Sequence, residues 1–309
     1  MLKEPVIIDT DPGIDDFMAL VLAARCERFD IKALTPVAGN QVFEKVWHNA
    51  RGIAALLGID CIVTKGAEKP LIVEQELADA VHGETGLGGL ILPESDAPVC
   101  NRYAWDVMYE EAKKNPGKLH IIAIGPLTNV AIAIRKYPDI VELIGKLTIM
   151  GGSAKFGNHS PYGEFNIWVD PHAAAIVFRS GLKVRMFGLD ANKTCQMSVQ
   201  DFHDIMAVDC SIKQEINAAL NFSIEAAHGY GAPAPVLHDA VTMAGIIDET
   251  LMDFVECYTD VEVRSRTSFG RTICDVRNTW GKAPNSFVAV KGSKDKFKSA
   301  IISSLNKYR

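Results

Sequence analysis

Four aspartates gather near the start of the chain. An apolar run predicts a buried strand over residues 6–9, and Pro12 can then begin a helix whose first turn contains Asp15 and Asp16. Parallel strands bring their carboxyl ends to one edge of a sheet, which is the usual place of an active site in α/β proteins. We therefore expect four carboxylates to converge at that edge, those of Asp9, Asp11, Asp15 and Asp16.

Helix capping explains one or two of these aspartates, since a cap contributes ~1 kcal/mol. It does not explain four, because like charges a few Å apart repel and raise one another's pKa. A bound cation relieves that repulsion. Oxygen ligands without nearby His or Cys suit a hard ion, so the residues predict a site for Ca²⁺ or Mg²⁺.

Short β-branched runs alternate with helical periodicity through most of the chain. Helices are expected over residues 41–57 and after Asp170-Pro171, where Asp is an N-cap and Pro the first helical residue. The alternation predicts an α/β fold with an open, mainly parallel, Rossmann-like sheet flanked by helices. The expected parallel strands are apolar on both faces and cover residues 6–9, 31–37, 61–64, 119–124, 146–150 and 183–188.

The sequence pattern changes after Asn192, and it predicts mostly helix to about Ile247. Residues 259–263 and 271–276 then predict a small antiparallel hairpin, followed by a last strand at 287–290 and a closing helix at 294–305. We see no internal repeat and no Pro/Ser-rich linker, so a single domain over residues 1–309 is expected.

The composition argues against several classes of function and partner. The 32 basic and 38 acidic residues give a net charge of −6, which argues against nucleic acid or an anionic membrane surface as partner. No apolar run reaches the ~18 residues that span a bilayer. The seven cysteines are scattered without a Cys-x-x-Cys pair and read as reduced thiols. With no signal-peptide pattern at the start, a cytoplasmic protein is expected.

Several short motifs, in their order along the chain, resemble the inosine-uridine-type nucleoside hydrolase family. One motif alone is weak, whereas together they span most of the chain and are highly specific. The motifs are Asp9-Thr10-Asp11-Pro12-Gly13-Ile14-Asp15-Asp16, Val37-Ala38-Gly39-Asn40, His82-Gly83-Glu84-Thr85-Gly86, Gly125-Pro126-Leu127-Thr128-Asn129, Met150-Gly151-Gly152, Glu164-Phe165-Asn166 and His238-Asp239.

The resemblance implies a Ca²⁺-dependent N-ribohydrolase that splits a ribonucleoside (uridine or cytidine, inosine, or both kinds) into ribose and free base. It implies that Ca²⁺ is held by the carboxylates of Asp11, Asp16 and Asp239 and by the main-chain carbonyl of Ile124. Asp11 would also be the general base. His238 would lie on the base side as the proton donor.

The resemblance also implies the residues that hold the nucleoside. Ribose hydroxyls would be held by Asp15, Asn40 and Asn166, and the 5′-hydroxyl by Asn158 and Glu164. His82 lies in the Gly-rich segment that closes over the sugar in this family. Relatives carry base-contacting side chains in the segment with His228 and Tyr230, and the sequence leaves open which of the two points inward. Relatives are usually homotetramers or homodimers.

The chemistry of the residues agrees with this function. Cleavage of an N-glycosidic bond passes through an oxocarbenium-like ribosyl cation, which carboxylates stabilise, and the base leaves more easily when an acid protonates it. Base preference stays open, with a slight lean toward pyrimidines.

Two alternatives stay open. The first is a haloacid-dehalogenase-type, Mg²⁺-dependent phosphatase, because Asp9-Thr10-Asp11 follows an apolar strand. Residues 12–16 do not continue that motif. The second is a non-catalytic protein that binds nucleoside or calcium on the same fold.

Overall fold

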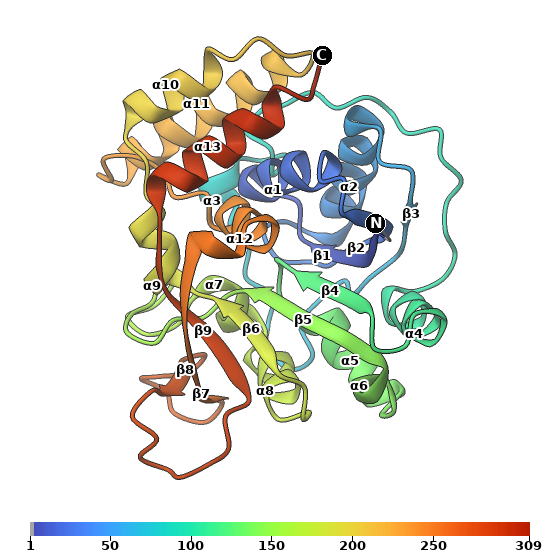
Figure 1. The fold of residues 1–309 in the computed structure, drawn as a ribbon, viewed down its shortest axis with the longest axis vertical. Coiled ribbons are helices and arrows are strands. Elements are labelled where there is room, and N and C mark those ends of the chain that lie inside the picture. The colour runs from blue at the N-terminus through green and yellow to red at the C-terminus, as the bar shows by residue number, and fades with distance from the viewer. Residues whose placement is uncertain (1–2) are drawn as a thin grey trace.

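The computed structural model describes residues 3–309 and contains a nine-stranded sheet in the order β3-β2-β1-β4-β5-β6-β9-β7-β8 (Figure 1). Neighbouring strands from β3 to β9 in this order are parallel, and β7 runs antiparallel to both β9 and β8. The predicted open, mainly parallel sheet is confirmed. The strands are β1 (Glu4–Thr10), β2 (Phe29–Pro36), β3 (Ile62–Val63), β4 (Leu119–Ala123), β5 (Ile144–Met150), β6 (Val184–Phe187), β7 (Met252–Val261), β8 (Thr272–Asp275) and β9 (Ser286–Gly292).

Both faces of the sheet are covered because successive side chains of a strand point to opposite faces. In β1, Val6 and Ile8 belong to one buried apolar cluster and Ile7 to the other. The first cluster contains side chains of α1 (Ile14–Ala24), α2 (Phe43–Leu57), α10 (Val199–Met206), α11 (Lys213–Gly229), α12 (His238–Ile247) and α13 (Lys294–Leu305). The second contains side chains of α4 (Ala104–Lys114), α5 (Thr128–Lys136), α6 (Ile140–Leu143) and α8 (Pro171–Phe178).

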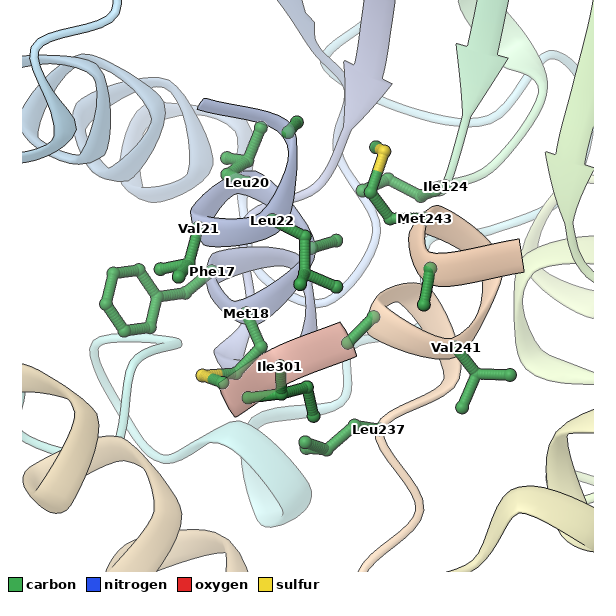
Figure 2. Close-up of a cluster of buried hydrophobic side chains, with 14 of the residues drawn as sticks. Phe17, Met18, Leu20, Val21, Leu22, Ile124, Leu237, Val241, Met243 and Ile301 are labelled. Carbon is green, nitrogen blue, oxygen red and sulfur yellow. The ribbon is translucent and has the colours of Figure 1, made fainter. Parts of the chain in front are cut away.

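Helices α1 and α12 pack against each other inside the first cluster (Figure 2). Side chains such as Met18 and Leu22 of α1 and Val241 of α12 are fully or almost fully buried there. Helices that are apolar on nearly every side belong to a protein core. Their packing fixes the first turns of α1 and α12 relative to each other, and these turns contain Asp15, Asp16 and Asp239.

The first helix begins two residues later than Pro12. Gly13 is the N-cap of α1, and its N–H donates to Oδ2 of Asp16 at 2.9 Å. Asp15 and Asp16 still fall in the first turn, as predicted.

The antiparallel edge is longer than predicted. The hairpin is confirmed, since residues 258–261 of β7 pair with residues 272–275 of β8. However, β7 begins at Met252 rather than at residue 259, and its first half pairs with β9. Exposed Asp253 and Glu256 interrupt the apolar pattern of that half, so its strand signal is weaker.

The strand order reverses direction at β1, whose neighbours are β2 on one side and β4 on the other. Ligands of open α/β sheets bind at such a point, outside the carboxyl ends of the strands. In the part of the chain that the structure describes, no helix is long and apolar enough to cross a membrane.

Candidate active site

A pocket of about 670 Å³ opens where β1 and β4 end. The two strand ends are joined by a hydrogen bond of 2.8 Å from the N–H of Ile124 to the carbonyl of Asp9. Asp11 and Ile124 therefore lie on the same wall of the pocket, as predicted from the convergence of parallel strands.

Asn40 joins two of the predicted site aspartates. Its backbone N–H donates to Oδ2 of Asp11 at 2.7 Å, and its side-chain amide lies 3.2 Å from Oδ2 of Asp16. Asp16 also accepts from the hydroxyl of Thr10 at 2.5 Å. The preceding residue must be glycine, because a Cβ on Gly39 would lie 2.2 Å from Oδ2 of Asp11. The loop after β2 therefore holds these carboxylates in fixed orientations.

Three carboxylates meet at the first turns of α1 and α12. One oxygen from each of Asp15, Asp16 and Asp239 lies within 4.8 Å of the other two. Burial, reinforced by the charge of neighbouring carboxylates, raises the pKa of Asp11 and of Asp239 well above the ordinary value and that of Asp16 to about 7.

These carboxylates fit a hard cation. Asp11, Asp15 and Asp239 each have a buried Oδ1 without a hydrogen-bond partner among the described residues. No lysine or arginine lines the described part of the pocket. Unpartnered buried carboxylate oxygens are costly, and oxygen-only ligand sets suit Ca²⁺ or Mg²⁺.

Two histidines from different helices, His82 and His238, line the pocket. His238 is the first residue of α12 and lines the pocket, and burial lowers its pKa. His82 ends the short helix α3 (Asp79–His82) and is buried, so it is not a solvated loop residue. Its Nδ1 accepts from the N–H of Ile14 at 3.2 Å, which ties the Gly-rich segment to the start of α1.

Comparison with known proteins decides the family. A profile described as inosine-uridine preferring nucleoside hydrolase matches residues 6–299. The chain belongs to this nucleoside hydrolase family. It is 36% identical over 307 residues to the pyrimidine-specific ribonucleoside hydrolase RihA of Salmonella arizonae, covering 98% of this chain and 99% of the relative. The RihA of Escherichia coli strain K12 matches with the same identity and coverage.

Solved nucleoside hydrolase structures show the same fold. A plant nucleoside hydrolase, PpNRh1, superimposes with a TM-score of 0.92 at 31% identity and covers 98% of both chains. A purine-preferring ribonucleoside hydrolase from Gardnerella vaginalis gives a TM-score of 0.92 at 29% identity, with 99% of both chains covered. The chain is therefore an N-ribohydrolase by family.

Three predicted sugar contacts of this hydrolase lie on another side of the pocket. Glu164 is the N-cap of α7 (Phe165–Val169) and accepts from the N–H groups of Asn166 and Gly152 at 3.0 and 2.8 Å. Burial raises the pKa of Glu164 to about 7. Asn158 lines the pocket too, and its Oδ1 accepts from the N–H of Phe165 at 3.0 Å.

Asn166 forms a hydrogen bond with Ile124, whose carbonyl is a predicted ligand of the cation. Its amide nitrogen donates to the carbonyl of Ile124 at 2.8 Å and lies 3.2 Å from that of Met150. A carbonyl oxygen has two lone pairs, so this contact leaves one on Ile124 for a further partner.

The sequence left open which of His228 and Tyr230 points inward. Among the described residues, Tyr230 lines the pocket and His228 does not. His159, Gln196 and Ser223 line it as well, although no motif or spacing points to them. Asn192 lies behind the pocket with its amide nitrogen 3.4 Å from Nδ1 of His238.

Proposed function

We propose that this chain hydrolyses the N-glycosidic bond of ribonucleosides in a Ca²⁺-dependent reaction and prefers pyrimidine nucleosides. The observation that carries the proposal is the arrangement of the pocket. Asp11, Asp15 and Asp239 line the pocket together with His238, Asp16 lies next to Asp15 and Asp239, and the described lining contains no lysine or arginine. A group that stabilises a cationic sugar and a group that can protonate a base thus face one cavity.

Asp11, Asp16, Asp239 and the carbonyl of Ile124 would hold the ion. When bound there, Ca²⁺ supplies a polarised water and an anchor for the 2′- and 3′-hydroxyls of the ribose. The unpartnered oxygens of Asp11 and Asp239 support this assignment.

Asp11 is the general base in this proposal. Its Oδ2 is occupied by the N–H of Asn40, whereas its Oδ1 has no partner among the described residues. A carboxylate oxygen has two lone pairs, so Oδ1 could contact the ion with one and take a proton from the attacking water with the other. Oδ1 of Asp15 is also without a partner and can accept from a ribose hydroxyl, as can the amide oxygen of Asn166.

Negative charge around the sugar stabilises the transition state. The anomeric carbon becomes positively charged as the base departs, and fixed carboxylates act on that charge most strongly where water is excluded. Asp11 and Asp239 are each at most 3% exposed, which satisfies this condition.

His238 is the proton donor to the leaving base. Burial lowers its pKa, with the nearby carboxylate of Asp15 opposing the shift. A lower pKa makes the imidazolium a stronger acid, which suits a weakly basic leaving group.

The pyrimidine preference rests on the curated relatives. The RihA proteins at 36% identity are named pyrimidine-specific, while the purine-preferring Gardnerella enzyme is 29% identical. We also propose a cytoplasmic homotetramer or homodimer.

A panel of nucleosides tests the proposal. The purified protein is incubated with uridine, cytidine, inosine, guanosine and the corresponding 5′-monophosphates, and free base and phosphate are measured by chromatography. We expect base release from uridine and cytidine at the highest kcat/KM. Faster release from inosine or guanosine would overturn the pyrimidine preference, and no release from any nucleoside would leave a binding protein.

The phosphatase alternative is disfavoured by Asp9, which would have to be its nucleophile. Asp9 is fully buried and does not line the pocket. Its Oδ1 accepts from the hydroxyl of Thr35 at 2.6 Å and from the amide of Asn129 at 2.8 Å. A carboxylate enclosed in this way cannot reach a phosphate, so phosphate release from the monophosphates is not expected.

A further inference from the structure

Asn192 is a buried polar residue that the proposed chemistry does not yet use. It ends α9 (Leu189–Asn192), which follows β6, and its side chain is 0% exposed. Burying an amide costs free energy unless the amide is hydrogen-bonded. Its Nδ2 lies 3.4 Å from Nδ1 of His238, and its Oδ1 has no partner among the described residues.

The amide can serve the imidazole in either of two orientations. As placed, its N–H points at an unprotonated Nδ1 of His238. Turned by half a rotation, Oδ1 of Asn192 accepts from a protonated Nδ1 and is no longer without a partner. In both orientations the amide of Asn192 occupies Nδ1. Because Asn192 lies outside the pocket lining and His238 within it, Nε2 is the ring nitrogen left for the pocket.

A second contact from the same segment holds the chain just before His238. Gln196, four positions after Asn192, donates from Nε2 to the carbonyl of Ala234 at 2.8 Å. Ala234 belongs to the loop that leads into α12. Residues 192–196 therefore contact both the ring of His238 and the loop that carries it.

We propose that Asn192 is a positioning residue that orients His238 with Nε2 toward the leaving base. Asn192 touches neither substrate nor cation and acts only through the direction of the imidazole. The inference rests on the proposed function, in which His238 protonates the base. An imidazole free to rotate about its Cβ–Cγ bond would spend part of its time with the proton aimed away from the base, which lowers turnover rather than binding.

The test is Asn192→Leu, which has nearly the same shape and no polar atom. Two substrates are compared: uridine, whose base needs a proton, and p-nitrophenyl riboside, whose phenolate leaves without one. We expect kcat for uridine to fall ~10–100-fold, a part of the full effect of a general acid, with KM near that of the wild type. The rate with p-nitrophenyl riboside should stay near that of the wild type. Asn192→Asp keeps an acceptor oxygen at the same place and should retain more of the uridine rate than Asn192→Leu.

Thr194→Val is the matched control in the same segment. The hydroxyl of Thr194 donates to the carbonyl of Ala191 at 2.6 Å and accepts from the N–H of Gly292 at 2.7 Å, but it does not contact His238. This variant loosens the segment without releasing the imidazole, so its ratio of the two rates should equal that of the wild type. Asn192→Ala replaces Asn192→Leu if thermal melting shows that leucine unfolds the protein, and the same split of rates is expected.

Three results would overturn the role of Asn192. They are an equal fall with both substrates, an unchanged uridine rate, and a shift of the ratio in Thr194→Val as large as in Asn192→Leu. His238→Ala, measured alongside, distinguishes a failure of the role of Asn192 from a failure of the proposed function. If it lowers the uridine rate selectively while Asn192→Leu does not, only the role of Asn192 fails. If the wild type cleaves neither substrate, so that neither uracil nor p-nitrophenolate is released, the proposed function itself fails.

Discussion

The backbone N–H of Asn40 lies 2.7 Å from Oδ2 of Asp11 and thereby decides which oxygen of that carboxylate is free. Residues 29 positions apart in the chain meet here because β1 and β2 are parallel neighbours and end at the same edge. Oδ1 of Asp11 is left without a donor from residues 3–309. A base that must take a proton from water needs such a free lone pair.

Asp11→Asn should lower kcat for uridine by ~10²–10⁴, because it removes both the base and one negative charge from the site. The amide keeps the shape, so the thermal midpoint should change little or rise as carboxylate repulsion falls. Steady-state kinetics and thermal melting check the two parts. Turnover close to that of the wild type would mean that another residue activates the water.

Removing the cation should abolish base release, and adding Ca²⁺ should restore it. The physical reason is that Asp11, Asp15, Asp16 and Asp239 repel one another when no positive charge lies among them. Ca²⁺ that binds only the folded chain should also raise the thermal midpoint as its concentration rises. Full activity in protein shown to be metal-free by elemental analysis would contradict the proposed cofactor.

Uridine should be cleaved far faster than 2′-deoxyuridine. A missing 2′-hydroxyl leaves buried acceptors such as Oδ1 of Asp15 unpaired, and a site built for a hydroxyl discriminates strongly against its absence. The ratio of the two kcat/KM values measures this contact. Equal values would show that the sugar is not held by its diol.

His238→Ala should lower hydrolysis of uridine by ~10²–10⁴ and leave hydrolysis of p-nitrophenyl riboside nearly unchanged. The alanine removes the proton donor and leaves the carboxylates in place. If both rates fall together, His238 shapes the pocket or supports Asp239 instead. If neither falls, the acid is to be sought among the other groups that line the pocket, His82 and Tyr230.

Glu4 should stabilise the fold at neutral pH and lose this effect in acid. Its carboxylate lies 3.3 Å from Nδ1 of buried His120 and 2.9 Å from Nζ of Lys146, and the close approach of His120 is the main cause that lowers the pKa of Glu4 to about 2. A carboxyl pKa that is lower in the folded than in the unfolded chain stabilises the fold above the unfolded value of about 4.5. The stabilisation then disappears as the pH falls from about 4.5 to about 2.

Glu4→Gln tests this pH dependence by urea unfolding. The variant should be less stable than the wild type at pH 7 by about 1 kcal/mol or less, since the pair is partly exposed and screened by solvent. The difference should close toward pH 2. Glu256→Gln is the control, because the pair of Glu256 with Lys183 is largely exposed and should contribute little at any pH. A gap that persists unchanged into acid would contradict the role of the Glu4 carboxylate.

The sheet and the acidic side of the site could be predicted from sequence because their signals are local. The apolar run before Asp9 and the spacing of Asp15 and Asp16 lie within one strand and one helical turn. Asn192 could not be found in this way. It contacts a residue 46 positions later, and its burial depends on how α9 and α12 pack, which no periodicity in either segment records.

Another part of the pocket lining could not be predicted for a related reason. Gln196 comes from a loop and Ser223 from α11, and each is an ordinary surface residue when its own segment is read alone. For Tyr230 the sequence left open whether it or His228 points inward. Which of them points inward is decided by tertiary packing.

The burial of α1 and α12 in one core gives the two sides of the pocket different mobility. To release Asp16 or Asp239, the molecule must separate helices whose side chains are almost all buried, so these carboxylates should be released only with global unfolding. The hydrogen-bonded amides in the middle of α1 and α12 should accordingly exchange slowly. Tyr230 at the end of α11 is 62% exposed and has no such restraint. If the nucleoside binds as proposed, its sugar would meet a rigid wall, and its base would meet one that can adjust to its size.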